Sequence, residues 1–307
     1  MRPLRGIALK LASVVVFILM ASLIKAVSDR VPPGQAVFFR SFFAIPVIVV
    51  WLVLRGELAT GFRTANPMGH LWRGVVGTTA MGLGFAGLAY LPLPEVTAIG
   101  YAAPLLTVIF AAMFLGENVR LFRISAVVLG MIGVLIVLSP RLTIVPGAPV
   151  EMAQAFGAML VLAGAVFAAL AQVFVRKLVL TEATSAIVFW FSVTATALAL
   201  VTLPFGWVWP TPREAALLVS CGLLGGIGQI FLTAAYREAD ASLVAPFDYA
   251  SMIFALVIGY WAFDEVPSLT TLGGAVLIVA AGVLIILRER YLGIKRARQR
   301  KAMTPQG

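Results

Sequence analysis

The chain has 307 residues, of which 61% are hydrophobic and 12% are charged, and its mean hydropathy is +1.03. Soluble domains usually contain about 45–50% apolar and about 25% charged residues, so the composition excludes an ordinary soluble protein. It predicts an all-α membrane protein, and the formal net charge of +10 then reflects the positive charge that such proteins keep on their cytoplasmic side. One cysteine and one histidine provide no basis for a disulfide or a His/Cys metal site, and we expect no metal and no cofactor.

Ten apolar stretches follow one another along the chain, and each is about 20 residues long, which is enough to cross a bilayer as a helix. Prolines mark many of the connections, where a missing N–H group does least harm. The first stretch is too long for the apolar part of a cleavable signal peptide, so we expect it to be the first span. The ten expected spans cover residues 6–27, 34–54, 71–91, 94–115, 121–139, 152–175, 184–203, 213–235, 241–263 and 267–287.

The positive charges predict how these spans are oriented. With the N-terminus in the cytoplasm, 18 of the 23 Lys and Arg residues fall on the cytoplasmic side, against four on the outside. The positive-inside rule therefore favours cytoplasmic N- and C-termini in a bacterial plasma membrane. We expect the basic tail at 288–307 to lie on anionic lipid headgroups, and we do not expect a nucleic-acid partner.

The second span contains Arg40 within the apolar run VFFRSFFAIPVIVV (37–50). A permanently charged guanidinium persists in a bilayer only if it reaches the interface, finds a partner or faces a wet cavity. We hypothesise that Arg40 faces a central cavity and anchors an anionic or carbonyl group of a ligand, with Asp248 as a counter-charge when no ligand is bound. The structural alternative is a tie to the first extracellular loop, at Asp29.

The fourth and ninth spans reveal an internal repeat. Residues 93–119 and 241–267 align at an offset of 148, which places Tyr101 opposite Tyr249 and a glutamate at the end of each span. We expect these two glutamates to cap neighbouring helices or to pair with loop arginines.

The repeat divides the chain into two halves of five spans, at 1–140 and 152–287. Because five is odd, the second half must enter the membrane in the opposite sense to the first. Such inverted repeats are typical of secondary transporters, whose substrate site lies near the midplane between the halves.

Five motifs stand out along the chain: FFR (38–40), LWRG (71–74), LPLPEVTAIGYAAPLLTVIFAAMFLGENV (91–119), GVLIVLSP (133–140) and LVAPFDYASMIFALVIGYWAFDE (243–265). They resemble those of the EamA family of the drug/metabolite transporter superfamily, and the similarity spans essentially the whole chain. The resemblance implies a carrier with ten helices that moves small organic metabolites across the bacterial plasma membrane. The FFR, LPLPEV and VAPFDY motifs further resemble the subgroup that contains riboflavin and S-adenosylmethionine importers.

The candidate substrate site is assembled from polar and aromatic side chains inside the spans. Aromatic rings can stack on a planar heterocycle, glutamines offer donors and acceptors, and a buried aspartate can contact a cation or carry a proton. Each of these side chains could instead pack or hydrogen-bond between helices. The candidates are Arg40, Tyr101, Gln172, Trp190, Gln229, Asp248 and Tyr249.

No motif for ATP binding or hydrolysis occurs, so we expect a transporter and not an enzyme. The sequence predicts a secondary carrier that works by alternating access, with riboflavin or a similar heterocyclic metabolite as the substrate and proton coupling as an option. Amino acids and S-adenosylmethionine are alternative substrates, and a membrane enzyme or receptor without transport is the rival class. His70 and Glu182 are expected in loops, with Glu182 on a solvated face.

Overall fold

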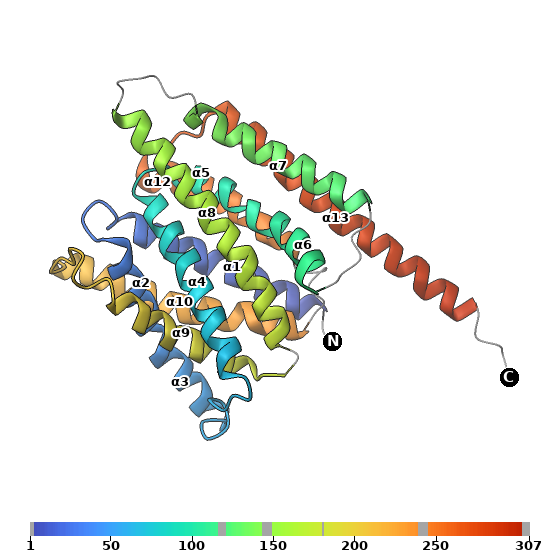
Figure 1. Cartoon of the computed structure of the whole chain (residues 1–307), viewed down its shortest axis with the longest axis horizontal. Coiled ribbons are helices and arrows are strands. Elements are labelled where there is room, and N and C mark those ends of the chain that lie inside the picture. The colour runs from blue at the N-terminus through green and yellow to red at the C-terminus, as the bar shows by residue number, and fades with distance from the viewer. Residues whose placement is uncertain (1–2, 116–120, 143–148, 180, 239–244, 303–307) are drawn as a thin grey trace.

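The structure is a computed structural model that describes residues 3–115, 121–142, 149–179, 181–238 and 245–302. Within these ranges the regular elements are all helices, and they form ten segments, because three segments consist of two consecutive helices (Figure 1). Five segments are long and apolar enough to cross a membrane by length and composition alone, and shorter apolar helices accompany them. The predicted all-α membrane fold with ten spans is confirmed.

The segments of each half follow the expected spans closely. The first half consists of α1 (Pro3–Lys25), α2 (Pro33–Phe42) with α3 (Ala44–Leu54), α4 (Pro67–Leu88), α5 (Leu93–Gly100) with α6 (Ala102–Leu115), and α7 (Leu121–Leu142). The second half consists of α8 (Pro149–Leu178), α9 (Thr184–Leu200), α10 (Pro212–Glu238), the 3₁₀ helix η1 (Ala245–Tyr249) with α12 (Ala250–Phe263), and α13 (Leu269–Ala302). Helix α13 continues beyond the expected end of the tenth span at 287, so residues 288–302 extend the same helix.

Prolines explain two of the interruptions. The second segment breaks at Phe43 and the fourth at Tyr101, three residues before Pro46 and Pro104 respectively. A proline cannot donate to the carbonyl four residues earlier, and its ring pushes that carbonyl away, so the helix is disturbed one turn before it.

The two halves pack together symmetrically, so the main helix contacts from the first half to the second have equivalent contacts from the second half to the first. Helix α1 packs along α10, and its counterpart α8 packs along α4. Helices α7 and α13, which are counterparts of each other, lie side by side along one edge of the bundle (Figure 1). Each first helix of a half therefore rests on the third segment of the other half, as a two-fold axis between inverted repeats requires.

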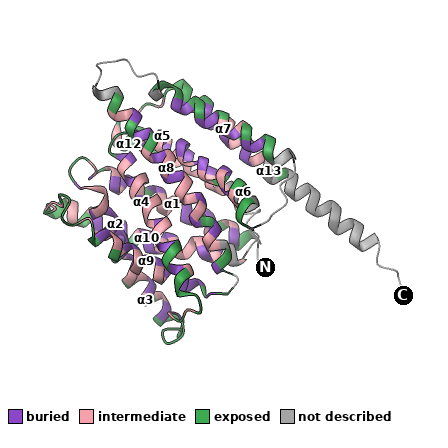
Figure 2. Ribbon diagram, in the orientation of Figure 1, coloured by how far each residue is buried: buried purple, intermediate pink, exposed green. Residues whose placement is uncertain are grey.

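The described side chains divide into a buried interior and an apolar outer surface. Buried residues occupy the faces where segments meet, and exposed residues run along the outer faces, as Figure 2 shows for α7. The exposed residues of α7 include Val128, Ile132 and Leu135, which recur at helical spacing. An apolar stripe on the outside of the bundle is what a lipid-facing helix presents.

Glycines allow α7 and α13 to approach each other closely. A Cβ atom added to Gly133 would lie 2.8 Å from the carbonyl oxygen of Gly274, and one added to Gly274 would lie 2.6 Å from the carbonyl oxygen of Gly133. Real Cβ atoms do not come so near to backbone oxygens, so both positions require glycine. Small residues serve this purpose in membrane helices, where close backbone packing replaces much of the hydrophobic driving force.

The reciprocal glycine contact predicts a sharp positional effect. Gly274→Ala should lower the thermal midpoint of the purified protein, because overpacking a close helix contact costs about 1–3 kcal/mol. Gly273→Ala is the matched control, since an added Cβ there meets no atom within 4 Å. Equal midpoints for the two variants would contradict the close contact between α7 and α13.

Candidate substrate site

The candidate site is described relative to the two ends of the helix bundle. We call the end at which α1 begins the inner end; it also holds the turn between α3 and α4 and the turn between α8 and α9. The outer end holds the connections α1–α2, α4–α5, α9–α10 and α12–α13. The described part of the chain enters the bundle with α1 and leaves it with α13 at the same end (Figure 1).

A largely buried ion pair ties the halves together at the outer end. Lys25 Nζ at the end of α1 lies 2.8 Å from Glu265 Oε1, and the two side chains are 14% and 13% exposed. Lys25 also donates to the carbonyl oxygens of Leu88 and Leu91, while Glu265 Oε2 accepts a 2.8 Å hydrogen bond from the N–H of Leu93. Glu265 thus caps α5, as expected, although its charged partner is a lysine of α1 and not a loop arginine. Its repeat counterpart, Glu117, lies outside the described residues.

This ion pair predicts a large stability effect. Glu265→Gln should lower the thermal midpoint strongly, because removing one partner of a buried pair leaves an uncompensated charge and costs about 3–5 kcal/mol. Glu57→Gln is the control with the same substitution, since Glu57 pairs with Arg55 at 3.7 Å and both side chains are about half exposed. If the two variants lose the same stability, the pair of Lys25 and Glu265 does not hold the outer end together as a buried pair would.

Tyr101 and Tyr249 contact each other. Their ring centroids are 5.1 Å apart in an edge-to-face arrangement, both side chains are buried, and the Tyr101 hydroxyl lies 2.6 Å from Ser251 Oγ. The hydroxyl of Tyr249 points at Gly282 of α13. The placement does not support the expectation that these rings stack on a substrate, because each already has a partner where α5 meets α12.

Asp248 has a lysine partner. Its Oδ1 atom lies 2.7 Å from Lys10 Nζ of α1, and the Lys10 side chain is only 2% exposed. The expected role of Asp248 as a counter-charge for Arg40 is therefore wrong: the pair that forms joins α1 to η1. Lys10 stands alone in an apolar run, so the rule that singled out Arg40 could also have singled it out.

Arg40 is buried and has no polar partner among the described residues. Its side chain is 4% exposed, so it does not snorkel to the headgroups, and no ion pair with Asp29 or any other described acid forms. It extends from α2 towards α10, where a Cβ on Gly225 would lie 3.0 Å from Arg40 Nε. The guanidinium carbon lies 5.4 Å from the centre of the Phe191 ring of α9.

Arg73 joins Arg40 at the same ring. Its guanidinium carbon lies 3.5 Å from the centre of Phe191, and the side chain is 7% exposed. The Nε and Nη1 atoms of Arg73 are buried without a hydrogen-bond partner in the described part of the chain, as is Nε of Arg40. Gly77, one turn further along α4, leaves the space that Nη1 occupies.

Sequence reasoning missed Arg73 because its position near the start of the third span made it one more cytoplasmic charge. The signal that could have found it is Gly77 four residues later, since residues i and i+4 share a helix face and a glycine leaves room there for a long side chain. The unpaired atoms confirm how unusual this region is. In the described chain, all buried side-chain nitrogen and oxygen atoms without a hydrogen bond belong to α2 and α4, in Arg40, Ser41, His70, Arg73 and Thr78.

The two glutamines differ in placement. Gln229 is half-buried and lies one turn after Gly225 on α10, so it shares the helix face that contacts Arg40. Gln172 is exposed on the surface of α8. Gln229 is thus the glutamine that the structure brings towards the arginines.

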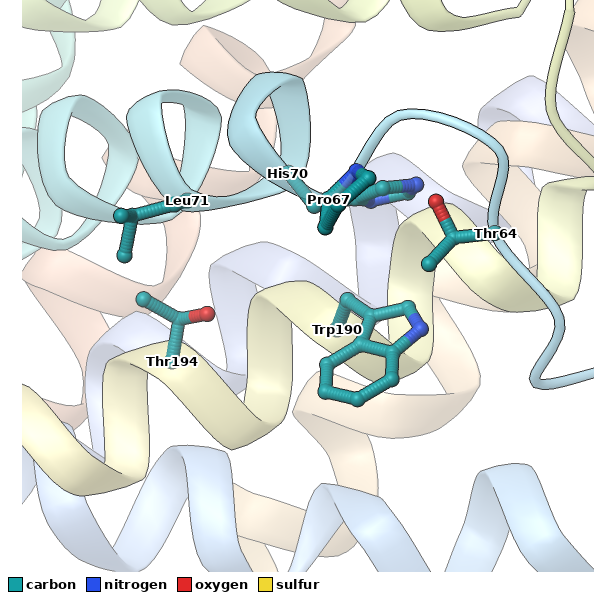
Figure 3. A pocket seen from close by; sticks show the side chains of 6 residues that line it. All are labelled: Thr64, Pro67, His70, Leu71, Trp190 and Thr194. Atoms are coloured by element: carbon teal, nitrogen blue, oxygen red, sulfur yellow. The ribbon is translucent and has the colours of Figure 1, made fainter.

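Trp190 lines a cavity at the inner end and not the centre of the bundle. The cavity has a volume of about 180 Å³ and lies between the start of α4 and α9 (Figure 3). The indole N–H of Trp190 donates a 3.0 Å hydrogen bond to the carbonyl oxygen of Phe62. His70 of α4, which lies one helical turn before Arg73 in the sequence, lines the same cavity as Trp190. The lining residues of the cavity are Thr64, Pro67, His70, Leu71, Trp190 and Thr194.

A buried carboxylate ties the halves together at the inner end. Glu182, from the turn before α9, accepts hydrogen bonds from the N–H groups of Ala65 and Asn66 and from the Thr64 hydroxyl, at 2.9, 2.9 and 3.1 Å. His70 Nε2 lies 3.6 Å from the second oxygen of Glu182. The expectations of a solvated Glu182 and of a loop position for His70 are wrong, because both side chains are buried and His70 lies in the first turn of α4.

The contacts of Glu182 at the inner end depend on the protonation states of Glu182 and His70. Burial lowers the pKa of His70 below its ordinary 6.5, with Arg73 acting in the same direction, although Glu182 opposes the shift. Burial alone would raise the pKa of Glu182, but the hydrogen bonds from Ala65, Thr64 and Asn66 outweigh it and lower the pKa. Both groups therefore favour the folded state most when they have lost their protons.

A pH dependence of stability follows from the sign of these shifts. Between pH 7.5 and 5.5 the unfolded chain takes up a proton at His70 that the folded chain resists, so the thermal midpoint should fall as the pH falls through this range. His70 is the one histidine of the chain, so the fall should be smaller in His70→Gln. An undiminished fall in that variant would show that another group is responsible.

Two interlocked halves of opposite orientation, with buried polar groups where they meet, are an architecture that many membrane transporters share. The chain belongs to the EamA-like transporter family, whose sequence profile matches residues 4–139 and 155–288. The family resemblance found in the sequence is confirmed, and the chain is a multi-pass membrane transporter of the drug/metabolite type.

Individual relatives carry different substrate names. The chain is 32% identical to the pseudopaline exporter CntI of Pseudomonas aeruginosa, over 91% of this chain and 95% of that one. It is 30% identical to the S-adenosylmethionine uptake transporter of Rickettsia prowazekii, over 94% of each chain, and 30% identical to the riboflavin transporter of Rhizobium johnstonii, over 93% and 89%. A solved crystal structure shares the fold with a TM-score of 0.68 at 22% identity, over 94% of this chain and 98% of that one.

Proposed function

We propose that the protein is an alternating-access carrier in the bacterial plasma membrane, with cytoplasmic termini, and that its substrate is a small organic metabolite with an anionic group. The observation that carries this proposal is the burial of Arg40 between α2, α9 and α10 without a polar partner in the described chain. A buried polar group without a hydrogen bond is costly, and a charged one more so. Such a cost is retained where a ligand group supplies the missing contacts.

The ties at the two ends support alternating access. Lys25 and Glu265 join the halves at the outer end, and Glu182 joins them at the inner end through residues 64–66. The arginines lie between these ties. Opening one end while the other stays tied would expose the site to one side of the membrane at a time.

The arginines also bear on the choice of substrate. Riboflavin, the substrate expected from the sequence, offers carbonyl groups but no group that is ionised at neutral pH. Amino acids and S-adenosylmethionine carry a carboxylate, which matches the planar fork of a guanidinium. We therefore place carboxylate-bearing metabolites ahead of riboflavin. Proton coupling through Asp248 belongs to the same proposal, because protonating this acid would break its pair with Lys10.

Arg40→Lys tests the proposal, because it keeps the charge but loses the fork of donors. In proteoliposomes that contain only this protein, labelled S-adenosylmethionine and amino acids are the first solutes to test for uptake. The apparent affinity for a transported solute should fall about tenfold or more in the variant, since hydrogen bonds to charged groups contribute about 1.5–3 kcal/mol.

Arg55→Lys is the matched control, because Arg55 is exposed and pairs with Glu57 at the inner end. An unchanged affinity in Arg40→Lys, in protein that folds normally, would contradict the contact. Absence of flux for every solute would instead favour the rival class of a receptor or enzyme.

A further inference from the structure

The second buried guanidinium changes the charge that the substrate has to supply. Arg40 and Arg73 both lie against Phe191, at 5.4 and 3.5 Å from its ring centre, so they belong to one cluster although they come from different helices. Two like charges this close repel each other in a medium of low dielectric constant. The face of an aromatic ring attracts a cation, but it does not neutralise two of them.

Six of the described acids have partners other than the two arginines. They form ion pairs or hydrogen bonds as follows: Glu57 with Arg55, Glu182 with residues 64–66, Glu214 with Arg30, Glu238 with Arg5, Asp248 with Lys10, and Glu265 with Lys25. No ion pair joins an acid with a described side chain to either buried arginine. The chain thus supplies two positive charges here and, among the described residues, no negative one.

The buried donors of α2 and α4 that have no hydrogen-bond partner fit the same kind of ligand. The buried atoms without partners include Nε of Arg40, Nε and Nη1 of Arg73, and the hydroxyls of Ser41 and Thr78. Guanidinium N–H groups only donate, and hydroxyls can donate. The hydroxyls are informative, because several other threonines and serines of the helices donate to the carbonyl four residues earlier, as Thr79 and Thr107 do. A cluster of donors with a double positive charge suits an oxyanion with two negative charges.

We propose that Arg40 and Arg73 form a two-armed site for a dianionic end of the substrate, either a dicarboxylate or a phosphate group, with Phe191 holding the two guanidiniums in position. This inference rests on the carrier function proposed above and narrows its substrate class from one negative charge to two. Gly77 and Gly225 belong to the site, because their missing side chains make room for the guanidiniums.

The first test measures binding of succinate, inorganic phosphate and butyrate to the purified protein by the shift in thermal midpoint, at constant ionic strength. Butyrate has the carbon count of succinate but one carboxylate. Succinate or phosphate should raise the thermal midpoint at a concentration at least tenfold lower than butyrate needs for the same shift. Arg73→Met should abolish this difference. Arg55→Met is the control variant, because its guanidinium is exposed.

The second test needs no ligand. Replacing an unpaired buried charge with an apolar side chain of similar length should raise the thermal midpoint without ligand, because the cost of the unpaired charge disappears. We therefore expect a higher midpoint for Arg73→Met and Arg40→Met, and no rise for Arg55→Met. If both buried variants lower the midpoint, the arginines hold the fold together and the two-armed site is overturned.

The outcomes separate this inference from the carrier proposal. Equal stabilisation by butyrate and succinate, or stabilisation by S-adenosylmethionine alone, would overturn the dianion site and leave a carrier for a singly charged group. Lack of response to every anion, together with unchanged transport in Arg40→Lys, would overturn both.

Discussion

Among the side chains that the structure describes, two lysines and two arginines lie inside helical segments and are largely buried, and the way each charge is compensated governs the rest of the structure. Lys25 is neutralised by Glu265 at the outer end, and Lys10 by Asp248 nearer the inner end. Arg40 and Arg73 have no such partner in the described chain and share the ring of Phe191 instead. The paired charges lie where helices of the two halves are joined, and the two arginines form the site that we propose for the substrate.

The packing of the two halves against each other determines where these charged side chains lie. Because α1 rests on α10 and α8 rests on α4, neither half can bury its own first helix, and the contacts that close each end run between halves. The ties at the two ends also involve equivalent elements. At the outer end Arg30 and Gln35 reach the connection before α10, and at the inner end Glu182 reaches the connection before α4. Inverted repeats produce this correspondence, since what one half does at one end its counterpart can do at the other.

Sequence alone was sufficient to predict the fold and one buried residue of the candidate site. Lipid requires every backbone polar group to be satisfied within the segment, so ten long apolar stretches could only be helices, and the odd number in each repeat fixed the inversion. The cost of a charge in an apolar run identified Arg40. The equivalence of Tyr101 and Tyr249 in the two repeats was also visible in the sequence. The contact between their rings was not, because an alignment does not show how far each residue lies from the two-fold axis.

The remaining site residues depend on contacts between segments far apart in the chain. Arg73 stands near the start of its span, where a charge normally reaches water, and only the packing of α4 against α9 shows that it turns inwards. The pair of Lys10 with Asp248 joins the first and ninth segments, and neither residue points to the other in the sequence. Trp190 was expected beside the substrate, but the hydrogen bond to Phe62 holds its ring at the inner cavity.

The central claim is that both buried arginines hold the same anionic group, and an experimental structure with a heavy-atom dianion tests it most directly. Bromosuccinate carries two carboxylates and a bromine atom that anomalous scattering locates without ambiguity. We predict a bromine peak beside Phe191, with carboxylate oxygens within hydrogen-bond distance of both Arg40 and Arg73. A peak elsewhere in the bundle, or a bound anion held by one arginine while the other pairs with a carboxylate of the chain, would contradict it.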